Sequence, residues 1–84
     1  MASVFQNKVI AEYESKGYTV INVIKFSENG WPDLQCLKKG EPDTWIECKE
    51  GKDTLKPLQK YRIRQLRKLG KIAFCLHDTK GKIY

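Results

Sequence analysis

Four short apolar runs limit what this chain can fold into. They span six to nine residues each and end at polar or glycine-containing segments: residues 18–26, 33–38, 44–49 and 71–77. This length is typical of strands, and the first run is also rich in β-branched and aromatic side chains. All four fall well short of the roughly 20 apolar residues of a membrane-spanning helix. We therefore expect a sheet and no membrane span.

Two further segments carry helix signals at both ends. Ser3 can cap a helix that runs to about residue 16, and Gly17 follows at the usual stop position. Pro57 suits the first position of a second helix, which continues to residue 69 and is followed by Gly70. The first helix precedes all four apolar runs and the second precedes the last.

The predicted order of elements is therefore α-β-β-β-α-β. A polar break at residues 27–32 (SENGWP) follows the first strand, and the next two strands are joined by a short turn, as in a β-hairpin. We expect an α/β fold over residues 1–84, a single domain with a mixed central sheet flanked by helices.

The charge balance limits the classes of binding partner that suit this chain. Lys and Arg outnumber Asp and Glu by 16 to 10, which gives a net charge of +6 and an isoelectric point near 9.3. Such a balance favours nucleic acid, with an anionic membrane surface as the weaker alternative. The N-terminus lacks the layout of a signal peptide, so we expect a cytoplasmic protein.

In the run at residues 44–49, the residues that would pack in the core and those that could act chemically lie on opposite faces of the predicted strand. Strand alternation puts Glu47 and Lys49 on one face, and Asp33 opens the preceding strand, where a hairpin would bring it beside Glu47. Two carboxylates and an ammonium suit phosphodiester hydrolysis, because carboxylate oxygens hold Mg²⁺, which neutralises phosphate charge and activates water. By itself the Glu47/Lys49 spacing fits an exposed ion pair equally well, worth about 0–1 kcal/mol.

Three motifs in order give the sequence a resemblance to known nucleases: Gly30-Trp31-Pro32-Asp33, Glu47-Cys48-Lys49 and Gln59. On these residues the chain resembles the PD-(D/E)XK nuclease superfamily and, within it, the small stand-alone VRR-NUC proteins of bacterial viruses. The resemblance runs nearly end to end. It implies a restriction-endonuclease-like core that acts in a host cell or a bacterial cytoplasm.

The resemblance also implies roles for individual residues. Asp33 and Glu47 would bind Mg²⁺ or Mn²⁺, the backbone carbonyl of Cys48 would be a further ligand, and Lys49 would be catalytic. Gln59 would lie near the site, and helical phase agrees, because it falls on the apolar side of the second helix.

The first helix departs from the family pattern. Such nucleases commonly carry a glutamate there, and the position that matches best, eleven residues before Gly17, is Gln6. An amide can hydrogen-bond water but contributes no charge to a metal site. The first-helix acid therefore stays unassigned, with Gln6 as the candidate site residue.

A basic stripe follows the second helix. Lys60, Arg64, Arg67 and Lys68 fall within about 100° of arc, opposite Leu58, Leu66 and Leu69, and Lys52 and Lys56 extend the charge along the preceding loop. Such a stripe is often only a solvated face. Beside Glu47, phosphate contact by Lys52, Lys56, Lys60 and Arg64 is the better interpretation.

Together these features predict a structure-selective DNA endonuclease. No helix has the layout of a sequence-specific reader, so branched DNA such as a Holliday junction or flap is favoured, although the residues do not distinguish DNA from RNA. Trp31 would stack on an unpaired base or pack over the site. Symmetric cutting of two strands needs two centres, which predicts a homodimer. The alternatives are a non-catalytic nucleic-acid-binding module with the same fold and a small protein that binds another enzyme.

Overall fold

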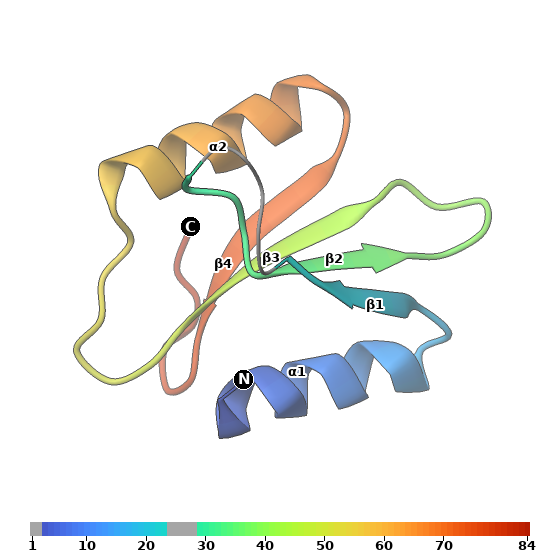
Figure 1. Cartoon of the computed structure of the whole chain (residues 1–84), viewed down its shortest axis with the longest axis horizontal. Helices are drawn as coiled ribbons and strands as arrows, with labels where there is room; N and C mark the ends of the chain where they lie inside the picture. The colour runs from blue at the N-terminus through green and yellow to red at the C-terminus, as the bar shows by residue number, and fades with distance from the viewer. Residues whose placement is uncertain (1–2, 24–28) are drawn as a thin grey trace.

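A computed structural model describes residues 3–23 and 29–84, which form a five-stranded sheet between two helices (Figure 1). Helix α1 (Val4–Ser15) begins at Ser3, whose side-chain oxygen accepts a hydrogen bond from the Gln6 backbone N–H at 3.0 Å. Helix α2 (Pro57–Lys68) begins with proline in the first turn, where the missing N–H costs no helical bond. Both helix predictions are confirmed to within a residue or two at each end.

The strands lie in the sheet in chain order. They are β1 (Thr19–Asn22), β2 (Leu34–Leu37), β3 (Thr44–Lys49), β4 (Ile72–His77) and β5 (Gly81–Lys82). β1, β2 and β3 pair antiparallel, β4 pairs parallel with β3, and β5 returns antiparallel on β4. The α/β class, the hairpin and the mixed sheet are therefore confirmed. The two-residue β5 was not predicted, and residues 24–28, the end of the predicted first strand and the start of the polar break, lie outside the described residues.

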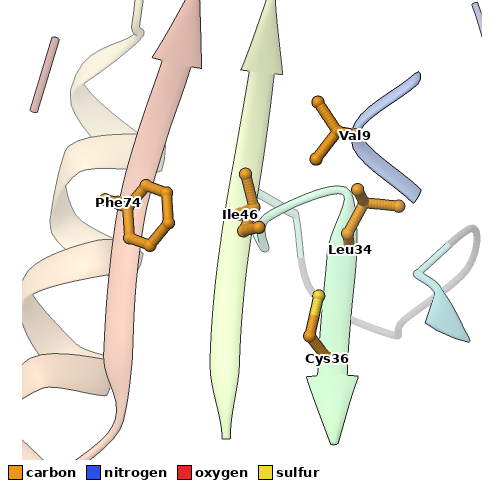
Figure 2. Packing of buried hydrophobic residues seen from close by; sticks show 5 residues of the cluster. All are labelled: Val9, Leu34, Cys36, Ile46 and Phe74. Carbon is orange, nitrogen blue, oxygen red and sulfur yellow. The ribbon is translucent and has the colours of Figure 1, made fainter. Parts of the chain in front are cut away.

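Each face of the sheet packs on its own helix. Under α1, the buried core joins one helix residue to residues of β2, β3 and β4: Val9, Leu34, Cys36, Ile46 and Phe74 (Figure 2). Under α2, the second core consists of Trp45, Ile63, Leu66, Ala73 and Cys75. Strands β3 and β4 both contribute to the two cores, so each is covered on both faces, and β3 is also the middle strand of the sheet.

The leucines opposite the basic stripe of α2 are buried to different extents. Leu66 is 4% exposed, whereas Leu58 and Leu69 are 45% and 67% exposed. Leu58 lies in the first turn of α2 and Leu69 at its C-cap, so both are close to the ends of the helix. No helix among residues 3–23 and 29–84 is long and apolar enough to cross a membrane.

Candidate active site

Strand β3 carries the chemical groups on the face that packs toward α2. Glu47 and Lys49 lie on this face with Trp45, and each of the two charged residues is only 3% exposed. Ile46 and Cys48 face α1 instead. The alternation predicted from sequence is thus observed, and the acid and the lysine form no exposed surface pair.

Asp33 reaches the same face from the start of β2. Leu34 pairs with Ile46, so the next position of this antiparallel register sets Asp33 opposite Glu47. The carboxylate of Asp33 is held by the backbone N–H of Cys48, which donates to Oδ2 at 2.9 Å. The hairpin therefore brings the two acids together, as expected from sequence.

The loop before Asp33 is fixed against α2. Gly30 has φ +87°, and a Cβ there would stand 2.6 Å from Cγ of Leu58, so only glycine fits this approach. The next residue, Trp31, is half-buried and packs against Trp45 with ring centroids 6.0 Å apart. These contacts explain the Gly-x-Pro-Asp spacing: glycine permits the close approach that sets the position of the aspartate.

Glu47 has one engaged oxygen and one free oxygen. Its Oε2 lies 3.6 Å from the Lys49 ammonium and accepts from the Gln59 side-chain amide at 3.4 Å. Its Oε1 is buried and has no hydrogen-bond partner among the residues that the structure describes. Burial, and next the negative charge of Asp33, raise the pKa of Glu47 from its ordinary 4.5 to about 8, against the opposing effect of Lys49.

A divalent cation suits this arrangement. A buried carboxylate oxygen without a partner is costly, and a neighbouring second carboxylate adds repulsion that a cation would relieve. Within residues 3–23 and 29–84, no group of three His, Cys, Asp or Glu side chains could hold a metal. Asp33 and Glu47 would therefore share an ion with backbone oxygen and water, which is how Mg²⁺ is commonly bound.

Gln59 joins the site from the first turn of α2. Its Oε1 accepts from the backbone N–H of Lys56 at 2.9 Å, while its Nε2 donates to Glu47. The inward phase predicted from sequence is thus observed. Gln6, by contrast, is half-buried on α1, and no side-chain hydrogen bond between described residues joins it to the site.

Sequence reasoning missed Asp53, which lies in the connection between β3 and α2. Its Oδ2 is 3.4 Å from the Lys49 ammonium, and its side chain is 53% exposed. The spacing of four residues after Lys49 was the available signal, but the connection gave no sign that it would fold back onto the strand.

The basic residues proposed for nucleic-acid contact are all exposed: Lys52, Lys56, Lys60 and Arg64. Two of them meet Tyr84, whose hydroxyl accepts from Arg64 at 2.7 Å and whose ring centroid lies 5.8 Å from the Lys60 ammonium. Arg67 also lies over the Tyr84 ring, with its guanidinium 5.1 Å from the ring centroid, and it donates to the backbone carbonyl of Ala73 at 2.8 Å. The basic stripe on α2 is therefore exposed to solvent, and Tyr84 packs against its side chains.

The arrangement of strands and helices is similar to that of two solved structures. One is described as a VRR_NUC domain: it shares 22% identity, with a TM-score of 0.72 over 83% of this chain and 76% of that one. The fold is that of a VRR_NUC domain. The other is Hjc of Archaeoglobus fulgidus, a Holliday junction resolvase, with 21% identity and a TM-score of 0.66 over 86% of this chain.

The chain spans 65% of the length of Hjc, so it matches a part of that protein. No family model matches the sequence, and no curated protein sequence matches it either. The structural likeness confirms the VRR_NUC-like fold expected from the motifs at residues 30–33, 47–49 and 59.

Proposed function

We propose that this protein is a metal-dependent, structure-selective DNA endonuclease that hydrolyses phosphodiester bonds. The observation that carries the proposal is the convergence of Asp33, Glu47 and Lys49 on one buried face, where Oε1 of Glu47 has no hydrogen-bond partner among the described residues. The VRR_NUC-like fold supports the same conclusion, since the motifs for which the sequence resembles these nucleases contribute the converging residues.

Asp33, Glu47 and the backbone carbonyl of Cys48 would hold the metal. Mg²⁺ or Mn²⁺, when bound there, would neutralise phosphate charge and activate water. Lys49 would stabilise the negative charge that develops on the phosphate, and Gln59 would hold Glu47 in orientation through its amide. Gln6 stays a candidate from the sequence alone, as an amide that could hydrogen-bond water.

The substrate class follows from the charged surface. Lys52, Lys56, Lys60 and Arg64 are exposed near the site and would contact phosphates without reading bases. We favour branched DNA, a Holliday junction or flap, because a solved structure of similar fold is that of a Holliday junction resolvase. Symmetric cutting of two strands would require a homodimer.

The experiment is cleavage of labelled duplex, flap, single-stranded and four-way-junction DNA, and of an RNA duplex, in Mg²⁺ or Mn²⁺. We expect the wild type to cut branched DNA and Asp33→Ala, Glu47→Ala and Lys49→Ala to lose cutting while they keep the native circular dichroism spectrum. Undiminished cutting by the three folded variants would overturn the proposal. Solution scattering of the wild type gives the mass, and a monomer would argue against the dimer.

The second candidate is a nucleic-acid-binding module without activity. It is favoured by Gln6, an amide where an acid is expected, and because no third His, Cys, Asp or Glu side chain in the described part of the chain joins Asp33 and Glu47 in a group that could hold a metal. It predicts salt-sensitive binding in a gel-shift assay and no cleavage with either metal.

A further inference from the structure

The ammonium of Lys49 lies between two carboxylates that belong to different segments. Glu47, on the same strand, is 3.6 Å away, and Asp53, in the loop after β3, is 3.4 Å away. The Lys49 side chain is 4% exposed, whereas that of Asp53 is 53% exposed. Asp53 is thus on the solvent side of a buried cation, where a phosphate group would have to approach.

The loop that carries Asp53 is held in place by the turn after β4. The two segments lie side by side (Figure 1), and His77 Nε2 bonds to the carbonyl oxygen of Gly51 at 2.7 Å. The N–H of Gly51 donates to Asp78 Oδ1 at 3.2 Å, and the N–H of Asp78 donates to the Lys49 carbonyl at 3.0 Å. Both peptide groups of Gly51 are therefore fixed two residues before Asp53.

Both ring nitrogens of His77 are engaged. The carbonyl oxygen of Gly51 can only accept, so Nε2 donates to it, and Nδ1 lies 3.2 Å from the backbone nitrogens of Thr79 and Lys80 and 3.1 Å from Oδ1 of Asp78. A buried side chain with both ring nitrogens engaged is a rigid brace. The position of Asp53 is consequently set by the fold.

The second carboxylate changes what Lys49 can do. The Lys49 ammonium has three N–H donors. If Glu47 were its only partner, these donors would point toward the carboxylate that is needed for metal binding. Asp53 draws the ammonium toward the solvent side, which leaves a donor for a phosphate oxygen or the attacking water. We propose that Asp53 is a positioning residue that holds the Lys49 ammonium at the mouth of the active site.

This role rests on the proposed nuclease function and has a definite kinetic signature. Asp53 does not meet the substrate in this proposal, so its loss should lower kcat and leave KM unchanged. An ion pair with a half-exposed partner contributes little to stability, so folding should be unaffected. Misplacement of a catalytic group by about 1 Å can cost on the order of 100-fold in rate.

The test compares Asp53→Asn, Asp53→Glu and the control Glu50→Gln, which removes the same charge from an exposed residue of the same loop. On four-way-junction and flap DNA we expect Asp53→Asn to lower kcat by about 10- to 100-fold. Asp53→Glu should restore part of the rate, and Glu50→Gln should match the wild type. A reduction in Glu50→Gln equal to that in Asp53→Asn would overturn the proposal, because it would reflect charge alone.

A second readout needs neither metal nor DNA. The side-chain NMR signals of Lys49, assigned by comparison with Lys49→Arg, should shift in metal-free Asp53→Asn and stay in place in Glu50→Gln. Unchanged signals, or an unchanged kcat in Asp53→Asn while the wild type cuts, would overturn the role of Asp53 alone. A wild type that cuts none of the substrates would overturn the nuclease function and this role with it.

Discussion

Replacing Glu47 by glutamine should stabilise the metal-free protein in a pH-dependent way. The carboxyl group loses its proton near pH 4.5 in the unfolded chain and near pH 8 in the folded protein. Between these values the native state binds one more proton than the unfolded state, so the free energy of unfolding falls by about 1.4 kcal/mol per pH unit as the pH rises. The stability that the protonated Glu47 carboxyl group contributes, relative to its ionised form, is present in full below pH 4.5 and is lost by about pH 8.

The loss amounts to about 3 kcal/mol between about pH 5 and pH 7. Glutamine keeps the size of the side chain and has no proton to lose, so Glu47→Gln should match the wild type near pH 5 and exceed its stability by about 3 kcal/mol near pH 7. The assay is urea denaturation in EDTA, followed by fluorescence of Trp31 and Trp45, with the exposed Glu50→Gln as control. A difference between Glu47→Gln and wild type that is constant with pH would refute the reasoning.

Saturating metal should make the wild type more stable than Glu47→Gln, the reverse of the order expected without metal. In the proposed function Mg²⁺ or Mn²⁺ would bind the ionised carboxylate, so saturating metal at neutral pH should raise the unfolding midpoint of the wild type by mass action. Glu47→Gln should gain little, because the amide is a poor ligand for a hard cation. An equal gain in both proteins would show that the ion binds elsewhere.

Three further outcomes follow from single contacts. Gly30→Ala should lower the free energy of unfolding by about 2 kcal/mol, because the new Cβ would meet Leu58 at a positive φ, and an unchanged urea midpoint would contradict this packing. His77→Leu should cost about 1–3 kcal/mol by leaving Gly51 and two turn amides unpartnered, and thermal unfolding with no shift would argue against the brace. Lys60→Ala should reduce the slope of log binding constant against log salt by about 1, measured by fluorescence anisotropy on junction DNA, and an unchanged slope would remove Lys60 from the interface.

The site was largely predictable because its key placements are local. Strand alternation alone assigns Glu47 and Lys49 to one face, and a hairpin alone sets Asp33 opposite Glu47. Gln59 was predictable for a similar reason, since helical phase decides which side of α2 it occupies.

The remaining features depend on contacts between distant segments or on element ends. Asp53 reaches Lys49 because His77, far along the chain, bonds back to the loop after β3. The exposure of Leu58 and Leu69 depends on how far α2 extends over the sheet, which helical phase does not specify. The strand β5 has two residues, too few to carry an alternating pattern.

The mixed pairing of β3 has a consequence for folding. Its antiparallel partner β2 adjoins it through a short turn, whereas its parallel partner β4 is separated from it by the whole of α2. Closing the shorter loop costs less conformational entropy, so the β2–β3 hairpin should form first. The two carboxylates would then meet early in folding, and the turn that supports Asp53 would be completed only when β4 docks.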